Sequence, residues 1–384
     1  MGSLTSRCSK PAVPFGGDKR IIDFTLANCI KTGITKVGIL SQYFSEGLHE
    51  YVREAYSDKG FALLPPDLNG SYYVGTADAV YQNMVFIEEN SPQYVLVLAG
   101  DHIYEMDYSE MVGFHIQSGA ATTIASTQVP KRVASSFGIL EVGEGWRIVG
   151  FEEKPPNPKT NIASMGIYVF TWSALRKYLI ADSANLESSH DFGKNVLPAM
   201  MAAGEPMYAY IFDGYWRDVG TVESLWEANM VYLDKNYMTE KPRTADAVVR
   251  ANPYRTADGI AVQSRTLFSD CSIYGMVEHT ILSPGVTVCE SAEVKNSVLM
   301  PGVHIGPGAK VNNAIIGFGA HVQNNVEIGV RGGSDFFIDE KICTGGISLV
   351  EPYLSVPSGL RMARGSHVHS GRFAQWKELD RVKE

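Results

Sequence analysis

Two lysines and two aspartates of this chain each lie beside a glycine or proline turn that borders an apolar run. Lys10 precedes a Pro/Gly turn, Asp101 follows Gly100, Lys154 precedes Pro155, and Asp218 stands between Trp216 and a Gly turn. Two carboxylates can hold a magnesium ion, and two cations can hold phosphates. This set is what nucleotidyl transfer requires, because that chemistry consists mostly of positioning and charge neutralisation. Taken singly, each residue also has an ordinary interpretation as a surface charge or a turn residue.

Asp101 lies in the segment around which the rest of the chain is organised, residues 94–104. The apolar run 95–98 predicts a strand covered on both faces, and Gly100 then allows a sharp turn. Asp101 therefore falls just past the carboxyl end of a strand, the edge at which open α/β sheets bind ligands. The alternative is that Asp101 only caps a following helix.

Residues 73–78 (YVGTAD) predict a glycine turn that leads into a helix. The backbone N–H groups of a helix N-terminus can bind an anion or the edge of a base, so Gly75 and Thr76 are candidates for ligand binding. A plain helix entry is the competing interpretation.

Strands and helices alternate along residues 1–234, a pattern that predicts a doubly wound, mostly parallel α/β sheet. We expect strands over 36–40, 95–98, 122–126, 164–170 and 208–212, a hairpin over 138–142 and 147–152, and helices over 77–89, 107–117, 172–179, 192–203 and 222–233. Residues 235–258 are polar, contain Pro242 and Pro253, and read as a linker.

From residue 259 to 364 the sequence repeats with a period of about seventeen. Leu282, Leu299 and Ile316 share this spacing, and three further series of residues keep the same period. Apolar residues recur about every six positions within it, which predicts three short strands per coil of a parallel β-helix. An insertion is expected over 331–341, and residues 365–384 form an atypical tail whose His367 and His369 we expect to be solvated.

The overall composition is that of a soluble globular protein of two domains. The chain has 384 residues, is 45% hydrophobic and carries a formal net charge of -9, which argues against nucleic-acid binding. Five cysteines without a C-x-x-C pair fit a reducing compartment. No apolar run approaches the roughly 18 residues of a membrane span, so a cytoplasmic protein is expected.

Several strings of this sequence resemble those of glucose-1-phosphate adenylyltransferase, the bacterial ADP-glucose pyrophosphorylase. They are 10–24 (KPAVPFGGDKRIIDF), 75–83 (GTADAVYQN), 99–108 (AGDHIYEMDY), 151–155 (FEEKP), 163–170 (ASMGIYVF), 190–194 (HDFGK) and 215–221 (YWRDVGT). They follow the order of the family and cover almost the whole first domain. That family has a left-handed parallel β-helix as its second domain, in agreement with the repeat.

The resemblance implies the Mg²⁺-dependent conversion of ATP and glucose 1-phosphate into ADP-glucose and diphosphate, a step of glycogen synthesis. It implies that Asp101 and Asp218 bind the metal, that Lys10 binds the phosphates of ATP, and that Gly75 and Thr76 lie near the adenine. The glucose 1-phosphate site would comprise Lys154, Glu153, Ser164, Tyr168, Asp191, Phe192 and Trp216. Family members are homotetramers or heterotetramers regulated by anionic metabolites, and Arg7 and Arg20 fall where such effectors bind.

The chain departs from the family pattern at its start. The family begins with a strand and a Gly-rich loop, GGxGxRL, that cradles the triphosphate, and nothing of that kind precedes Lys10. A non-catalytic regulatory subunit of the same enzyme is therefore an alternative, although such a subunit has no need of Lys10, Asp101, Lys154 and Asp218. A nucleotidyltransferase for another sugar, or an acyltransferase using a histidine of the coils, fits the sequence less well.

Overall fold

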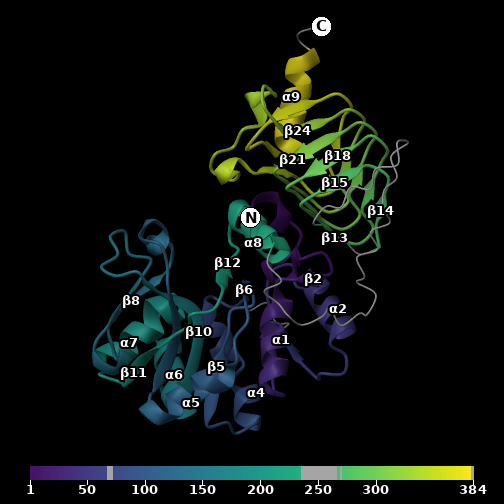
Figure 1. The fold of residues 1–384 in the computed structure, drawn as a ribbon. Coiled ribbons are helices and arrows are strands. Elements are labelled where there is room, and N and C mark those ends of the chain that lie inside the picture. The colour runs from purple at the N-terminus through teal and green to yellow at the C-terminus, as the bar shows by residue number, and fades with distance from the viewer. Residues whose placement is uncertain (67–71, 235–265, 269, 382–384) are drawn as a thin grey trace. The chain divides into compact units, whose positions relative to one another are not determined.

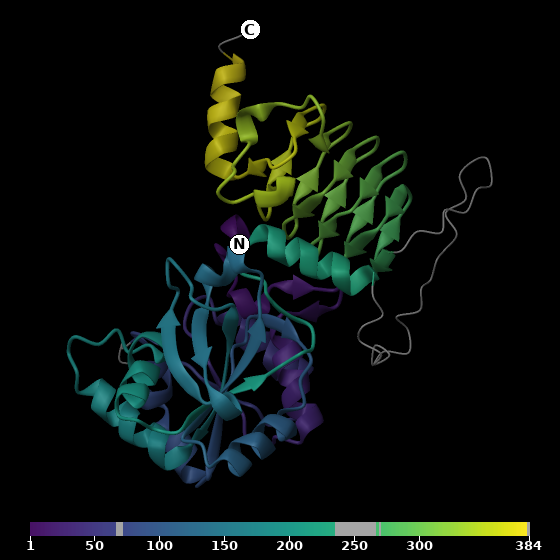
Figure 2. The same ribbon diagram turned by 60° about the vertical axis from the view of Figure 1, so that its left-hand side comes forward.

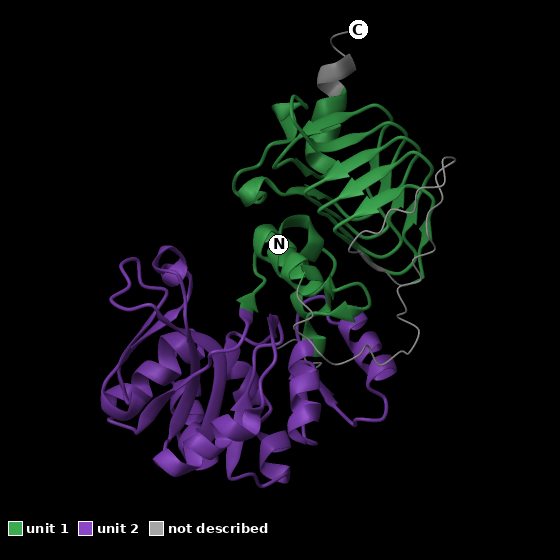
Figure 3. Ribbon diagram, viewed as in Figure 1, with its two compact units in different colours: residues 1–23, 217–384 green, residues 24–216 purple. Residues whose placement is uncertain are grey.

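The computed structural model describes residues 1–66, 72–234, 266–268 and 270–381 (Figure 1). The chain divides into two compact units, one of residues 24–216 and one of residues 1–23 with 217–384 (Figure 3). The predicted linker 235–258 lies outside the described residues. The domain boundaries predicted at 234, 259 and 364 stay a prediction.

A six-stranded sheet forms the centre of the unit 24–216 (Figure 2). Its strands are β5 (Tyr94–Val97), β7 (Thr122–Gln128), β8 (Gly138–Val142), β9 (Ile148–Glu153), β10 (Ile162–Thr171) and β11 (Met207–Ile211). The order is β11-β7-β10-β8-β9, with β5 also paired to β10. Side chains of β10 alternate between two cores: Phe170 packs with helices α6 (Trp172–Ser183) and α7 (Leu197–Ala202), and Val169 packs with α5 (Tyr108–Ser118).

The α/β class agrees with the prediction, but strand direction needs a correction. β10 runs antiparallel to β5, β7 and β8, and β8 and β9 form an antiparallel hairpin; within this sheet only β11 and β7 pair in parallel. The sheet is therefore mixed rather than mostly parallel. For β8 and β9 the physical reason is their short hairpin connection, because parallel neighbours need a long crossover such as an α-helix.

The remaining elements of this unit are only partly as predicted. β3 (Gly38–Leu40), α3 (Thr76–Gln82) and α4 (Met84–Glu89) fall on predicted ranges, whereas no element was predicted at α1 (Ile22–Thr32), α2 (Glu46–Ala55), β4 (Ala62–Leu64) or β6 (His102–Tyr104). The helix expected over 77–89 breaks at Asn83, whose side-chain amide donates to Ala79 O and to the Tyr73 hydroxyl. The helix expected over 192–203 begins as a π-helical turn, η5 (Phe192–Val196), before α7.

The other unit contains α8 (Val222–Asp234), the N-terminal hairpin β1 (Pro14–Phe15) and β2 (Lys19–Arg20), and a parallel β-helix of three sheets. One sheet holds β13 (Thr266–Phe268), β16 (Thr280–Leu282), β19 (Val298–Leu299), β22 (Ala314–Ile316), β25 (Ser348–Val350) and β28 (His367–Val368). The second holds β14 (Ser272–Ile273), β17 (Thr287–Val288), β20 (His304–Ile305), β23 (His321–Val322) and β26 (Ser355–Val356). The third holds β15 (Met276–Glu278), β18 (Glu293–Lys295), β21 (Lys310–Asn312), β24 (Glu327–Val330) and β27 (Arg361–Ala363).

The period of about seventeen residues predicted from the sequence is the spacing between residues that pair in successive coils. Val288 pairs with Ile305, and Ile305 with Val322, in parallel ladders. Leu282, Leu299 and Ile316 are fully buried, as expected for side chains that point into the coil.

Two details of the β-helix differ from expectation. The coil resumes at β25, after an insertion with two 3-10 turns, η6 (Asp335–Phe337) and η7 (Thr344–Gly346). The segment predicted as an atypical tail contains β28, which pairs with β25, and the helix α9 (Ser370–Arg381). His367 is buried rather than solvated, because it is part of β28 and bonds to the Ser3 hydroxyl. None of the described helices combines the length and apolarity needed to cross a membrane.

Candidate active site

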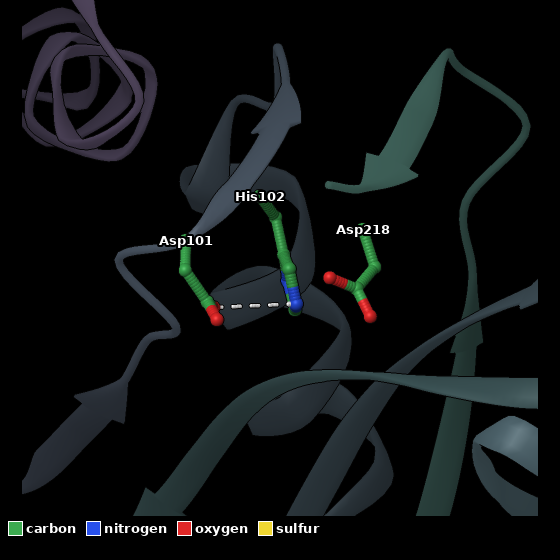
Figure 4. A group of neighbouring side chains, drawn as sticks. All are labelled: Asp101, His102 and Asp218. Atoms are coloured by element: carbon green, nitrogen blue, oxygen red, sulfur yellow. Dashed lines mark ion pairs between the residues drawn. The ribbon is translucent and has the colours of Figure 1, made fainter. Parts of the chain in front are cut away.

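Asp101 lies in the turn between β5 and β6, at the carboxyl end of β5. Its Oδ1 lies 3.4 Å from Nε2 of His102, an ion pair when the imidazole is protonated, and about a third (32%) of the Asp101 side chain is exposed (Figure 4). A strand rather than a helix follows Asp101, and α5 is capped by Asp107, which accepts from the amide of Ser109. The capping alternative for Asp101 is therefore wrong, and its partly exposed carboxylate lies at the carboxyl end of β5.

His102, which the sequence did not single out, packs against Trp216. The two rings meet edge to face with centroids 5.2 Å apart, and Trp216 also contacts Phe137 at 5.5 Å. Trp216 begins β12 (Trp216–Asp218), which pairs with β6. The strings AGDH and YWRD are thus joined through an aromatic contact. In the sequence, the only sign that His102 belongs to this site is its position directly after Asp101.

Lys10 and Asp218 form an ion pair in the unit that contains the β-helix. Lys10 Nζ lies 3.0 Å from Asp218 Oδ1, and both side chains are partly buried. Gly220 lies against both groups: a Cβ added there would be 3.2 Å from Asp218 Oδ1 and 3.5 Å from Lys10 Nζ. The pair brings together a cation that can bind phosphate and a carboxylate that can bind a metal.

Glu153 and Lys154 stand at the end of β9. The Lys154 ammonium lies 3.7 Å from Glu153 Oε1, and the lysine side chain is 64% exposed whereas that of Glu153 is 22% exposed. The Glu153 carboxylate lies against Gly138 and Gly193, since a Cβ at either position would be less than 3 Å from its Oε2. Burial raises the pKa of Glu153, and the charge of Lys154 opposes that rise. A partly buried acceptor and an exposed cation therefore stand side by side.

The loop of residues 189–192 is fastened to the start of α3. The amides of Ala77 and Asp78 donate to the carbonyl of His190, at 2.8 and 3.3 Å. The Thr76 hydroxyl donates to Asp191 Oδ2 at 3.0 Å and accepts from the amide of Phe192 at 3.1 Å. The protein's own loop thus occupies the amides of Ala77 and Asp78, and the binding of a ligand by Gly75 and Thr76 stays a prediction.

Three predicted sugar-site residues belong to the packed interior around β10. Ser164 is buried, and its hydroxyl accepts from the amide of Gly166 at 3.2 Å. Burial raises the pKa of Tyr168 to about 12. The ring of Phe192 is buried and lies 5.8 Å from that of Tyr168. Tyr168 and Phe192 therefore form one aromatic contact, which holds the 189–192 loop against the sheet.

Arg7 and Arg20, the candidates for anionic effectors, lie in the N-terminal segment. Arg7 is exposed, and Arg20 is half-buried in β2. Burial raises the pKa of the Cys8 thiol, and the charge of Arg20 opposes that rise, which places Arg20 near Cys8. The anion site at Arg7 and Arg20 stays a prediction.

Comparison with known proteins identifies the family. Residues 1–235 match the family model described as nucleotidyl transferase, and residues 248–350 match a GlmU-like C-terminal hexapeptide family, in agreement with a left-handed parallel β-helix. The chain is 42% identical over 372 residues to the glucose-1-phosphate adenylyltransferase of Desulforamulus reducens. The aligned residues cover 94% of this chain and 92% of that protein. The enzyme of the same name from Acetivibrio thermocellus is 40% identical over 95% of this chain and 88% of its own length. That of Bacillus cytotoxicus is 46% identical over 77% of this chain and 82% of its own length. The chain belongs to the glucose-1-phosphate adenylyltransferase family.

Proposed function

We propose that this protein transfers the adenylyl group of ATP to glucose 1-phosphate, forming ADP-glucose and diphosphate for the synthesis of glycogen or a related α-glucan. The family membership supports this activity. The structural observation that carries it is the ion pair of Lys10 with Asp218, because a phosphate-binding cation and a metal-binding carboxylate are the two parts that the reaction needs together.

We propose that Asp101 and Asp218 hold a divalent metal ion, Mg²⁺. Both carboxylates have about a third of the side chain exposed, so their oxygens are accessible to an ion that prefers oxygen ligands. Trp216 and Asp218 lie two residues apart on β12, so their side chains leave the same face of the strand. Trp216 in turn packs on His102, the residue that follows Asp101. The bound ion would neutralise charge on the triphosphate.

On the sugar side, Lys154 would bind the phosphate of glucose 1-phosphate. Its exposed ammonium can exchange the carboxylate of Glu153, 3.7 Å away, for a phosphate oxygen. Glu153, Ser164, Tyr168, Asp191, Phe192 and Trp216 would line the glucose pocket. Of these, the carboxylates of Glu153 and Asp191 can accept hydrogen bonds from sugar hydroxyls.

On the nucleotide side, Gly75 and Thr76 would lie near the adenine and Lys10 would bind the phosphates. A phosphate oxygen of glucose 1-phosphate attacks the α-phosphorus of ATP, and the bond from that phosphorus to the β-phosphate bridging oxygen breaks. The electron pair of that bond leaves with diphosphate. No covalent intermediate with the protein is required.

We further propose a cytoplasmic homotetramer or heterotetramer whose activity responds to anionic metabolites bound near Arg7 and Arg20. The non-catalytic alternative has less support, because Lys10, Asp101, Lys154 and Asp218 are all retained and the relatives named above carry the name of an enzyme.

The test is release of diphosphate from ATP, glucose 1-phosphate and Mg²⁺ by the purified chain. We expect turnover that needs both substrates and stops on chelation of the metal. Other nucleoside triphosphates and other sugar 1-phosphates in place of each substrate give the specificity control. Absence of turnover would contradict a catalytic role, and stimulation of an active family member by the silent chain would instead identify a regulatory subunit.

A further inference from the structure

The contact between α3 and the 189–192 loop joins two segments that have separate roles in the proposed function. Gly75 and Thr76 belong to the nucleotide side, whereas Asp191 and Phe192 belong to the sugar side. Thr76 Oγ1 lies 3.0 Å from Asp191 Oδ2 and 3.1 Å from the amide nitrogen of Phe192. One hydroxyl group thus bridges the two sides.

The Asp191 carboxylate is held at both of its oxygens. Oδ2 accepts from the Thr76 hydroxyl, and Oδ1 accepts from the amide of Lys194, 3.1 Å away, as the cap of η5. The backbone of Asp191 is fixed as well, since its amide donates to Asn195 Oδ1 at 3.1 Å. These partners fix the orientation of the carboxylate, and Thr76 alone among them lies outside η5, the helical turn that Asp191 caps.

The backbone of the loop packs closely against the start of α3. A Cβ at Gly75 would lie 2.2 Å from the carbonyl oxygen of His190 and 2.4 Å from that of Ser189, so residue 75 has no room for a side chain. The imidazole of His190 is in turn held by Asp182, with Nδ1 2.8 Å from Oδ2. The loop is therefore held at the two residues that precede Asp191.

We infer that Thr76 is a positioning residue for the sugar substrate: its hydroxyl orients the Asp191 carboxylate for glucose 1-phosphate and so couples nucleotide binding to sugar binding. This inference rests on the proposed function, in which Asp191 contacts the glucose. A nucleotide that orders the first turn of α3 also orders Asp191, so each substrate favours the geometry that the other needs.

The chain contains a matched control for this arrangement. The Thr32 hydroxyl accepts from the amide of Tyr108 at 3.1 Å, at the start of α5, which Asp107 caps. A threonine hydroxyl thus bonds to the first amide of an aspartate-capped helix here too, in the same unit but without a role in the proposed site. Thr32→Val and Thr76→Val each remove such a bond.

The experiment measures kcat and KM for both substrates in Thr76→Val, Thr76→Ser and Thr32→Val, together with thermal unfolding. A hydrogen bond to a charged group is lost in Thr76→Val, so the KM for glucose 1-phosphate should rise about tenfold while the KM for ATP changes less. Thr76→Ser should restore the wild-type KM, because it keeps the hydroxyl. Thr32→Val should lower the unfolding temperature by a similar amount as Thr76→Val and leave the KM for the sugar phosphate unchanged.

A double-mutant cycle with Asp191→Ala identifies the route of the effect. If Thr76 acts through Asp191, Thr76→Val should change the KM for glucose 1-phosphate less than twofold in the Asp191→Ala background. Additive effects, or a rise confined to the KM for ATP, would overturn the inference while the proposed function stands. Loss of turnover in the wild-type chain would instead defeat the proposed function itself.

Discussion

Replacement of Gly75 by alanine tests how closely α3 and the 189–192 loop must pack. Gly75 has φ -155° and ψ 178°, an extended conformation that alanine also adopts, so the substitution introduces no backbone strain. The added Cβ would lie 2.2 Å from His190 O, 2.4 Å from Ser189 O and 2.6 Å from His190 C. These are backbone atoms, so no side-chain rotation can relieve the overlap.

The energetic cost depends on the distance by which the loop must move. Ordinary contact begins near 3.4 Å, so the loop must retreat by about 1 Å. Such overpacking typically costs about 1–3 kcal/mol. The same movement stretches the bond from Ala77 N to His190 O, now 2.8 Å, and the bond from Thr76 to Asp191. For a unit of this size we expect the unfolding temperature to fall by roughly 2–12 °C.

The assay is thermal unfolding followed by circular dichroism, with the KM for glucose 1-phosphate as a second readout. Gly113→Ala is the control: Gly113 lies within α5, and a Cβ there would meet no heavy atom within 4 Å. That variant should be more stable than wild type by about 0.5–1 kcal/mol. An unfolding temperature of Gly75→Ala equal to that of wild type would refute the claim that this contact is tight.

Three further predictions concern the metal site, the sugar phosphate and acid stability. Asp101→Asn or Asp218→Asn should abolish turnover without changing the circular dichroism spectrum; retention of most of the rate would remove that residue from the metal site. Lys154→Ala should raise chiefly the KM for glucose 1-phosphate, because its exposed ammonium anchors a phosphate of the ground state, and an unchanged KM in steady-state kinetics would contradict this role. Burial lowers the pKa of His115 to about 4, so its unfolded form binds a proton at higher pH than the folded form. The free energy of unfolding should therefore be unaffected by His115 above pH 6.5. It should fall by about 3 kcal/mol through this histidine as the pH drops toward 4. Thermal unfolding of wild type and His115→Gln from pH 7 to pH 4 measures this, and a difference between them that does not vary with pH would exclude the histidine as its cause.

Sequence reasoning succeeded where a period or an apolar run is imposed by burial. Val288, Ile305 and Val322 had to recur at one spacing because stacked coils place equivalent residues in register, and their pairing confirms it. The position of Asp101 after a short strand was also predictable, because Gly100 ends an apolar run.

The errors concern features that depend on partners distant in the chain. The direction of β10 is set by its neighbours in the sheet, and its own apolar pattern is the same for either direction. The acceptor of the Ala77 and Asp78 amides was not predictable either, because the carbonyl of His190 lies more than a hundred residues further along. His367 looked like a solvated tail residue because its partner is Ser3, near the other end of the chain.

The insertion between β24 and β25 has a consequence for how this repeat array can change over evolution. Successive coils pair residues 17 apart, such as Ile305 with Val322, whereas pairs that span the insertion are 34 apart, such as Val322 with Val356. The inserted chain is therefore one coil in length, and it emerges from the stack without shifting the phase of the next coil. Its Thr344 hydroxyl bonds to Glu223 of α8 at 2.7 Å. A repeat unit released from stacking can thus acquire new contacts, and the array can diversify by unwinding one coil while its neighbours close the gap.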